Sequence, residues 1–481
     1  MQPMMQLERL DEVRWRLPRQ GNMRVDGMIY ADDLLMTHIQ NDPCVQQVAN
    51  VATLPGIVGR ALAMPDIHWG YGFPIGGVAA FDPDQGGVVS PGGVGYDINC
   101  GVRLHATQLE RGHVARDRDR IADALAHAVP AGVGVGKPDA RVADLDAILA
   151  DGARSLVGTD IVTPADLDSI EEGGRIPGAA PQWVSDRARE RGHGQIGSLG
   201  SGNHFLELDV VAEVYDEEAA QRFGLQEGGV TLLVHSGSRG LGHQVCEDML
   251  ALMLRASQAA GIVLPDKQLA CAPLYSDDAR RYLGAMAAAA NFAFANRSLI
   301  AHRALNALAA ATARKKPDLK ARLVYDVCHN IAKYEEHVID GRPMRVCVHR
   351  KGATRAFGPG HPGVPANYRD VGQPVIIPGD MGRYSYVLCG QKGAMDETFG
   401  SACHGAGRLL ARNQAKKLAS GREVQKRMAG LGIALRAASM SAVSEEAPEA
   451  YKDVADVVGV VEKAGIARRV ARLEPLVVVK G

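Results

Sequence analysis

The stretch VTLLVHSGSRGLGH, residues 230–243, sets a short apolar run directly before a loop of Gly, Ser and His. Its first six residues have the length and the aliphatic, β-branched composition of a buried strand. Over residues 243–260, an amphipathic helix is predicted because apolar side chains recur on one face, at Val245, Met249, Leu252 and Met253. A strand joined to a helix through a glycine-rich loop indicates a domain that mixes both kinds of element.

Similar patterns occur on both sides of this stretch. Further short apolar runs predict buried strands at residues 323–328, 344–349, 374–377 and 386–389. Helices are predicted at residues 116–127, 140–150, 405–419 and 276–315, the last Ala-rich and expected to break near its middle. Strands and helices do not alternate as βαβ units do. We therefore predict an α+β fold, a single large mixed domain covering residues 1–481.

Net charge and glycine content limit which kinds of function and fold suit this chain. The chain has 481 residues, 46% of them hydrophobic, and a formal net charge of −1. This charge gives no global attraction to nucleic acid, so any nucleic-acid contact must rest on a local basic patch. The 55 glycines, in a chain with ordinary apolar content, indicate tight turns and close backbone approaches.

Targeting signals are missing from the sequence as given. The first residues, MQPMMQLERLDEVRWRL, contain no apolar core of a signal peptide. No run of about 18 apolar residues predicts a membrane span. The eight cysteines are scattered without a CxxC pair, which favours free thiols in a reducing cytoplasm.

Five residues are candidate metal ligands. Asp97 and Cys100 are close enough for one tight turn to direct both at one ion, while His204, His235 and His329 lie at strand ends or in Gly loops. One carboxylate, one thiolate and three imidazoles suit Mn, Fe, Co or Zn better than Mg or Ca. Each is also compatible with an ordinary buried or turn residue, and spacing alone leaves both interpretations open.

Two glycine-rich segments could wrap phosphate oxygens with backbone N–H groups: GSLGSGN at residues 197–203 and HSGSRGLGH at residues 235–243. Neither is a Walker A loop, because GxxxxGK[ST] is absent. The glycines alone are weak evidence for this, and ordinary turns are the favoured explanation.

His404, in CHGAGR, is a candidate nucleophile at the start of the predicted helix 405–419. Gly405 and Gly407 leave the backbone open there, and a helix N-terminus favours an approaching phosphate. Histidine can attack phosphorus to give a phosphoramidate. Cys403 is an alternative nucleophile as a thiolate, and a capping or anion-binding role for His404 is a further alternative.

Six segments together resemble the signature segments of the RtcB family of RNA ligases. They are GVGYDINCGVR (93–103), GSLGSGNHFLE (197–207), HSGSRGLGH (235–243), HRKGATRAFGP (349–359), SACHGAGR (401–408) and EEAPEAYKDV (445–454). They follow the family order from Met64-Pro65-Asp66 to Lys480, so the resemblance covers nearly the whole chain.

The resemblance implies the mixed fold particular to these ligases, two Mn²⁺ ions and GTP. It implies that the metal ligands are Asp97, Cys100, His204, His235 and His329, with Cys100 bridging the two ions. His404 is then the guanylylated histidine, and Asp66 is the carboxylate that orients it. The implied nucleotide pocket comprises Asn203, Phe205, Leu206, Glu207, Asn330, Lys351, Pro378, Gly379, Asp380, Met381, Ser385, Gly405, Ala406, Gly407, Arg408, Tyr451 and Lys480.

The resemblance also implies a reaction in three steps. His404 attacks the α-phosphate of GTP, an RNA 3′-phosphate takes the GMP, and a 5′-hydroxyl end then expels GMP. A 2′,3′-cyclic phosphate is first hydrolysed to the 3′-phosphate. The expected RNAs are tRNA halves or broken RNA, with an archease-type activator as a further partner, and a monomer is expected. The rival interpretations are a metal-dependent phosphodiesterase without a nucleotide intermediate, and a non-catalytic RNA-binding protein.

The sequence departs from the family pattern near the expected base pocket and RNA path. Asp380 stands where Ser is expected, and Arg383-Tyr384 stand where small residues are usual. The segment 438–441 lacks an expected Arg, and Ala402 replaces a common Thr. Nucleotide preference and substrate range are the properties these changes affect. Candidate contacts to the RNA backbone are Arg187, Arg189, Arg191, Lys315, Lys316 and Arg412.

Overall fold

Two large β-sheets form the centre of the molecule in the computed structural model, which describes residues 5–136 and 144–481. The first sheet has the order β1-β2-β3-β4-β5-β13-β12. Its strands are β1 (Glu8–Arg9), β2 (Arg14–Leu17), β3 (Gly27–Tyr30), β4 (Ile57–His68), β5 (Ile75–Phe81), β13 (Arg342–Lys351) and β12 (Asn330–Ile339).

The second sheet has the order β11-β7-β9-β8-β19-β16-β15, and β18 pairs with β19 beside this path. Its strands are β11 (Arg322–Cys328), β7 (Gly101–Glu110), β9 (Gly229–Ser236), β8 (Phe205–Val214), β19 (Ala467–Lys480), β16 (Ser385–Gly390), β15 (Pro374–Ile377) and β18 (Ala434–Ala437). The two short pairs are β6 (Val88–Val89) with β10 (Ala272–Pro273), and β14 (Ala353–Arg355) with β17 (Ser401–Cys403). All five strands predicted from apolar runs are present, in β9, β11, β13, β15 and β16, and the α+β class is confirmed.

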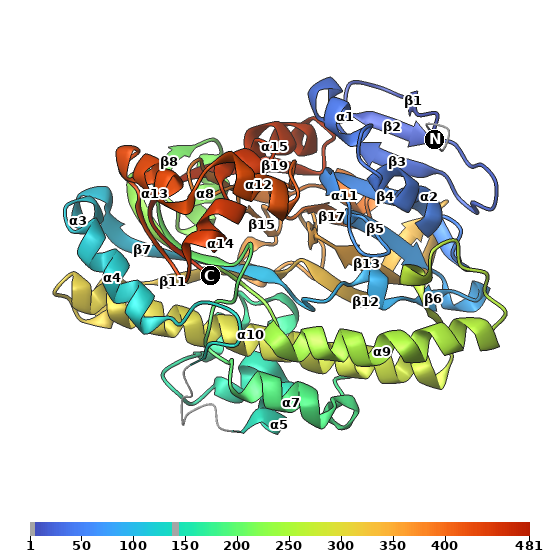
Figure 1. The fold of residues 1–481 in the computed structure, drawn as a ribbon, viewed down its shortest axis with the longest axis horizontal. Coiled ribbons are helices and arrows are strands. Elements are labelled where there is room, and N and C mark those ends of the chain that lie inside the picture. Colours follow the sequence, from blue (N-terminus) through green and yellow to red (C-terminus); the bar gives the residue numbers. More distant parts are fainter. Residues whose placement is uncertain (1–4, 137–143) are drawn as a thin grey trace.

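Two long helices, α9 (Arg239–Ala259) and α10 (Asp277–Ala311), run along one side of the sheets (Figure 1). The predicted break in the middle of α10 is wrong, because its 35 residues form one helix. Its polar residues Asn291, Asn296 and Arg297 are buried and hydrogen-bond to neighbouring loops, so they anchor the helix and do not interrupt it.

Shorter helices cover the remaining faces. They are α1 (Asp33–Ile39), α2 (Cys44–Val51), α3 (Arg111–Ala115), α4 (Arg118–Ala128), α5 (Leu145–Asp151), α6 (Pro164–Leu167), α7 (Asp186–His193), α8 (Glu217–Phe223), α11 (Lys392–Glu397), α12 (Arg412–Leu418), α13 (Gly421–Gly430), α14 (Met440–Glu445) and α15 (Val454–Lys463). The helix predicted at 116–127 corresponds to α4, and the one at 140–150 to α5, although residues 140–143 lie outside the described part.

The helix predicted at 405–419 is wrong over its first half, because regular helix begins only at Arg412. Gly407 has φ +75°, and a Cβ there would lie 2.2 Å from the carbonyl oxygen of Asp66. The segment is therefore an irregular loop pressed against Asp66, and His404 does not stand at a helix N-terminus.

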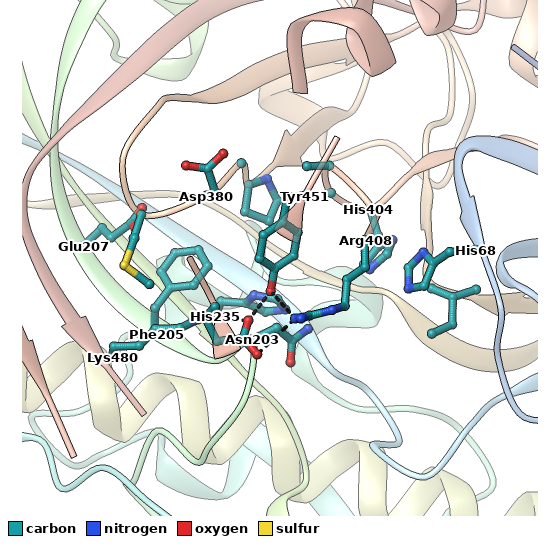
Figure 2. Close-up of a pocket in the computed structure, with 18 of the residues that line it drawn as sticks. His68, Asn203, Phe205, Glu207, His235, Asp380, His404, Arg408, Tyr451 and Lys480 are labelled. Atoms are coloured by element: carbon teal, nitrogen blue, oxygen red, sulfur yellow. Dashed lines mark hydrogen bonds and ion pairs between the residues drawn. The ribbon is translucent and has the colours of Figure 1, made fainter. Parts of the chain in front are cut away.

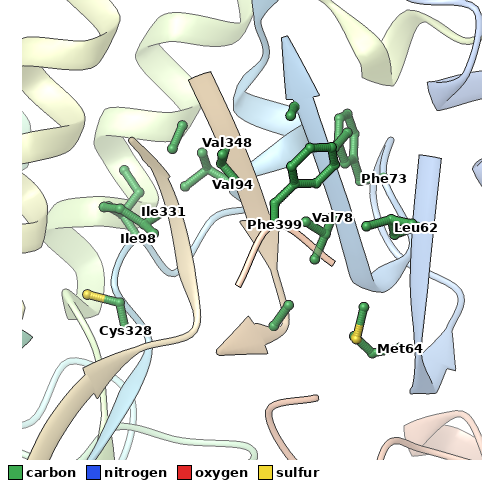
Figure 3. Close-up of a cluster of buried hydrophobic side chains, with 14 of the residues drawn as sticks. Leu62, Met64, Phe73, Val78, Val94, Ile98, Cys328, Ile331, Val348 and Phe399 are labelled. Carbon is green, nitrogen blue, oxygen red and sulfur yellow. The ribbon is translucent and has the colours of Figure 1, made fainter. Parts of the chain in front are cut away.

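The largest hydrophobic core cluster includes residues of the loop that carries Asp97 and Cys100 (Figure 3). Leu62 and Val78 from β4 and β5 pack in the same cluster as Val348 from β13. The cluster includes Val94 and Ile98, both fully buried, from the loop before β7. Because Ile98 is buried, it anchors the backbone between Asp97 and Asn99. Among the described residues, no helix has the length and hydropathy to cross a membrane.

Candidate active site

The sharp turn predicted between Asp97 and Cys100 is present. The Cys100 N–H donates to the Asp97 carbonyl at 2.9 Å, and Asn99 adopts a left-handed φ of +50°. Both functional side chains reach His204: its Nε2 lies 2.8 Å from Asp97 Oδ2 and 3.5 Å from Cys100 Sγ. The ligand atoms of these three residues lie within 4.8 Å of one another, which makes them a candidate metal centre.

Two further imidazoles extend this cluster. His235 Nε2 lies 3.2 Å from Cys100 Sγ, and the His235 and His329 rings are 5.6 Å apart. Burial lowers the pKa of both His235 and His329 well below the usual value, which keeps the rings neutral, the form that binds metals. All five candidate ligands are therefore neighbours in space.

Buried nitrogen atoms without hydrogen-bond partners indicate whether a cation fits between the five candidate ligands. Among the described residues, Nδ1 of His204, Nδ1 of His235 and both ring nitrogens of His329 are buried without a hydrogen-bond partner. An unpaired buried nitrogen is costly, and a bound cation would remove that cost for each nitrogen that ligates it. Burial, and next the charge of Asp97, raise the pKa of the Cys100 thiol, so its thiolate form needs a cation beside it. The donor set fits a transition metal.

The topology of the second sheet explains how distant residues meet. Four neighbouring antiparallel strands, in the order β11-β7-β9-β8, alternately end and begin at one edge. His329 follows the end of β11, Cys100 precedes β7, His235 lies near the end of β9, and His204 precedes β8. Each candidate ligand thus lies at the same edge of the sheet.

Arg297 of α10 connects the segments that carry these residues. Its Nη1 donates to the Asn99 carbonyl at 2.8 Å and to the Ser236 carbonyl at 3.0 Å. Its Nε donates to Asp326 Oδ1 at 2.8 Å, and the side chain is completely buried. One guanidinium therefore holds the Asp97 turn, the end of β9 and the strand before His329 together.

The two glycine-rich segments approach the cluster through their backbones. A Cβ at Gly237 would lie 2.4 Å from a carboxylate oxygen of Asp97, and one at Gly200 would lie 2.4 Å from His204 Nδ1. Asn296 joins the segments, because its Oδ1 accepts from the Gly197 N–H at 2.7 Å and its Nδ2 donates to the Gly237 carbonyl at 3.1 Å. These glycines therefore make room for the candidate ligands.

His404 is held by Asp66. Its Nδ1 lies 2.6 Å from Asp66 Oδ2, and the same oxygen accepts the N–H groups of His404 at 3.0 Å and Gly405 at 3.3 Å. Burial raises the pKa of Asp66, but the charge and hydrogen bonds of His404 outweigh this and leave it below its usual value. The ring nitrogen bound to the carboxylate is Nδ1, so Nε2 is the one available for chemistry. The His404 and His329 rings are 5.3 Å apart.

A cavity of about 230 Å³ joins His404 to the metal cluster (Figure 2). His404 and His68 lie on one side of the view, and Glu207 and Lys480 on the other. The predicted pocket residues that line it are Asn203, Phe205, Glu207, Pro378, Gly379, Asp380, Met381, Gly405, Ala406, Gly407, Arg408, Tyr451 and Lys480. Most of the predicted nucleotide pocket is thus brought to one cavity.

Four predicted pocket residues lie behind the wall. Leu206 is buried in a hydrophobic cluster, and Ser385 accepts the Gly379 N–H through its hydroxyl at 3.1 Å. Asn330 donates to the Asp97 carbonyl at 2.9 Å, and Lys351 donates to the Phe73 carbonyl at 3.1 Å. Their contacts support the wall and the metal turn from outside the cavity.

The wall also contains residues outside the predicted pocket: His68, Ile75, Arg412 and Glu446. Glu446 accepts from Arg408 Nη1 at 3.1 Å and from the Tyr451 hydroxyl, and Lys480 Nζ lies 3.8 Å away. Glu446 falls within the segment EEAPEAYKDV, and His68 follows Asp66 by two residues. Closeness to these segments in the sequence is the feature that could have identified both residues.

Two of the departures from the family pattern, Asp380 and Arg383, contact each other beside the cavity. Arg383 Nη1 lies 3.2 Å from Asp380 Oδ2, and Asp380 Oδ1 accepts the Gly382 N–H at 3.0 Å. Burial raises the pKa of Asp380 to about 6 despite Arg383. The neighbouring Tyr384 donates to Asp453 at 3.0 Å, which directs its hydroxyl to α15. The two departures at Asp380 and Arg383 are therefore coupled through an ion pair, and Asp380 lines the cavity.

The candidate RNA contacts differ in their surroundings. Arg412 lines the cavity. Arg189 donates to Asp146 and to the Pro181 carbonyl, and Lys316 donates to the Asp160 carbonyl, so both have structural roles. Arg191 is 37% exposed and donates to Gln244 at 2.9 Å. Arg187 and Lys315 are exposed.

Comparison with known proteins gives a consistent result. A family model described as tRNA-splicing ligase RtcB matches residues 47–481. A protein of Thermococcus kodakarensis named tRNA-splicing ligase RtcB is 52% identical over 483 residues, covering 100% of both chains. One of Archaeoglobus fulgidus with the same name is 52% identical, covering 99% of each chain. The RNA-splicing ligase RtcB of Mycobacterium tuberculosis is 51% identical, covering 90% of this chain and 100% of its own.

Proposed function

The chain belongs to the RtcB family of tRNA-splicing ligases, and from this premise we propose that it is an RNA ligase that requires GTP and Mn²⁺. It joins an RNA 3′-phosphate or 2′,3′-cyclic phosphate end to a 5′-hydroxyl end through a guanylylated histidine and an RNA-ppG intermediate. The observation that carries the proposal is the Asp66–His404 pair, whose imidazole lines the same cavity as His235 of the candidate metal cluster.

His404 is the nucleophile of the first step. Its Nε2 bonds to the α-phosphorus of GTP as the bond from that phosphorus to pyrophosphate breaks. Asp66 holds Nδ1 at 2.6 Å, which keeps the proton on that nitrogen and directs the Nε2 lone pair to the cavity. An oxygen of the RNA 3′-phosphate then takes the GMP from His404. Finally the 5′-hydroxyl oxygen bonds to the RNA 3′-phosphorus, and GMP leaves.

Metal ligation falls to Asp97, Cys100, His204, His235 and His329. Two bound Mn²⁺ ions would supply neutralisation of the charge that develops on phosphate oxygens. The nucleotide occupies the cavity, where Arg408, Arg412 and Lys480 offer positive charge to its phosphates. Glu207 and Asp380 offer acceptors to the N–H groups of a guanine edge.

The remaining parts of the proposal concern partners and location. The substrates are tRNA halves or broken RNA, and an archease-type activator assists turnover. The protein acts as a monomer in the cytoplasm, which is compatible with its eight free, buried cysteines.

One experiment tests the nucleotide chemistry directly. The purified protein is incubated with Mn²⁺ and GTP labelled at the α-phosphate, and the denatured protein is analysed for bound label. We expect a labelled protein, stable in base and labile in acid as a phosphoramidate is. Ligation of RNA ends without any labelled adduct and without a GTP requirement would instead identify a metal-dependent enzyme with no nucleotide intermediate.

A further inference from the structure

Asp66 holds two imidazoles. Its carboxylate binds Nδ1 of His404 at 2.6 Å, and its backbone carbonyl lies 2.9 Å from Nδ1 of His68. A carbonyl oxygen only accepts hydrogen bonds, so His68 Nδ1 carries the proton and donates it. In the neutral ring the other nitrogen, Nε2, is then an unprotonated acceptor.

His68 belongs to the reaction cavity. It is the last residue of β4, it is partly buried, and it lines the same cavity as His404 (Figure 2). Burial, with smaller contributions from the charges of Lys452 and His404, lowers its pKa to about 4. The ring is therefore neutral at physiological pH. In the described part of the chain, the hydrogen bond of its ring is made by Nδ1, and none is made by Nε2.

The backbone that carries His68 is fixed from behind. Lys452 is buried, and its Nζ donates to the Pro65 carbonyl at 3.0 Å and to the Ile67 carbonyl at 2.7 Å. These bonds bracket Asp66 on both sides. The segment that contacts both imidazoles is thus held by Lys452 on both sides of Asp66.

The proposed reaction needs a proton acceptor that the roles assigned above do not supply. When His404 Nε2 attacks GTP, no O–H bond breaks, because the imidazole keeps its Nδ1 proton at Asp66. The attack of the 5′-hydroxyl is different, because its proton must leave as its oxygen bonds to phosphorus. Asp66 Oδ2 is already occupied by three donors, and its Oδ1 is fully buried. Glu446 is occupied by Arg408 and Tyr451.

We propose that His68 is the general base of the sealing step. Its Nε2 takes the proton of the 5′-hydroxyl while the new P–O bond forms and the P–O bond to GMP breaks, so that GMP leaves as the anion and His68 becomes an imidazolium. This inference rests on the proposed function, since it assumes an activated RNA-ppG end. It assigns the two imidazoles on Asp66 to different steps, His404 to nucleotide transfer and His68 to sealing.

The test separates the two steps in His68→Gln and His68→Ala. Gln keeps a side-chain N–H that can donate to the Asp66 carbonyl, but it is not a base. Adduct formation is measured with α-labelled GTP, and sealing is measured in single turnover with RNA that already carries a 3′-ppG end. We expect sealing to fall by about 10²- to 10⁴-fold in both variants, while adduct formation changes by less than about tenfold. The exposed His127 of α4, changed to Ala, is the matched control.

A second measurement distinguishes a base from a structural support. Added imidazole should raise the sealing rate of His68→Ala in proportion to its free-base concentration, and it should not affect His68→Gln, in which the space is filled. Normal sealing by His68→Ala, or an equal fall of adduct formation and sealing without rescue by imidazole, overturns the proposal. Failure of the wild-type protein to form any adduct would instead count against the proposed function, so the two failures are distinguishable.

Discussion

Cys403 and His404 are consecutive residues with different surroundings. Cys403 is fully buried in β17, and burial raises the pKa of its thiol well above the usual value. His404 lines the cavity, with Nδ1 on Asp66. Because regular helix begins only at Arg412, no helix N-terminus at Gly405 favours a thiolate at Cys403, which supports His404 as the proposed nucleophile.

We expect His404→Ala to form no GMP adduct and to join no ends with GTP, whereas Cys403→Ala keeps most adduct formation. Because the third step does not use the His404 nitrogen as nucleophile, His404→Ala should still seal RNA that carries a 3′-ppG end. Gel analysis of label from α-labelled GTP gives the first result, and a sealing assay gives the second. Label that persists in the His404 variant and disappears in the Cys403 variant would reverse the assignment.

Asp380 gives a prediction about nucleotide choice and pH. Its pKa of about 6 means that the carboxylate is ionised above pH 6 and becomes protonated below it. Only the ionised form accepts two N–H groups from guanine. The preference for GTP over ATP in adduct formation should therefore decline as pH falls from 7 to 5, and Asp380→Asn should show a weaker preference at every pH. Competition between labelled GTP and unlabelled ATP measures this. Equal use of ATP by the wild-type protein at pH 7 would show that Asp380 does not read the base.

At the scale of single residues, the resemblance predicted more than physical reasoning from the sequence did. Asp66 and His404 are separated by 338 positions, so spacing could not pair them. Asn330 and Lys351 were expected in the pocket, but side-chain direction depends on partners that sequence does not reveal, here the Asp97 and Phe73 carbonyls. His68 was missed because a lone histidine at the end of a strand has no distinguishing pattern of its own.

At the scale of secondary structure, apolar runs located five of the buried strands, in β9, β11, β13, β15 and β16, since such runs need only local composition. The candidate ligands lie close together because four antiparallel neighbours, two of them not predicted from the sequence, share an edge, and that pairing is a tertiary property. The segment 405–411 was mistaken for helix because contact between Gly407 and Asp66 overrides local propensity. The middle of α10 stayed helical because its polar side chains find partners on other segments.

The role of α10 in holding the candidate metal cluster is testable at Arg297. Arg297→Lys removes the planar fork that reaches Asn99, Ser236 and Asp326, and we expect Mn²⁺ affinity to fall by about 10- to 100-fold. Arg297→Ala also leaves the buried Asp326 with one fewer partner, which should cost about 3–5 kcal/mol of unfolding free energy. Metal titration and denaturant unfolding measure the two effects. The exposed Arg255 of α9, changed to Lys, serves as the control, and unchanged metal affinity in Arg297→Lys would remove the guanidinium from this role.

At the scale of the whole molecule, a buried charge network contributes to acid stability. Glu171 is 1% exposed, binds Lys333 and accepts the Cys328 N–H at 2.8 Å. Burial raises the pKa of Glu171, but the charges of Lys333 and Arg355 outweigh it and bring the pKa to about 2. Because the folded value lies below the usual 4.5, this carboxylate stabilises the fold above pH 4.5, and the contribution is lost as pH falls toward 2.

The shift corresponds to roughly 3 kcal/mol at neutral pH. Urea unfolding between pH 7 and pH 2.5 should show a steep loss of stability below pH 4.5. Glu171→Gln should be less stable at pH 7 and should lose less on acidification. The exposed Glu190 of α7, changed to Gln, should follow the wild-type curve. An unaltered pH dependence in Glu171→Gln would show that other carboxylates dominate acid unfolding.

The largest core cluster supports the proposal that residues 1–481 form one domain. It contains buried side chains as far apart in sequence as Val13 and Ala467, and it includes residues of both large sheets, such as Val348 and Leu388. A boundary through this cluster would expose apolar surface on both sides, which is unfavourable.

The residues that meet at the shared strand edge are also synthesised in a fixed order relative to His404. The proposed metal donors, the four strands that present them and the α10 clamp are all encoded between residues 97 and 329. His404 and the cavity wall from Pro378 onward leave the ribosome later. Since all five proposed cation donors precede His404 in the sequence, the growing polypeptide contains these donors before it contains the proposed nucleophile.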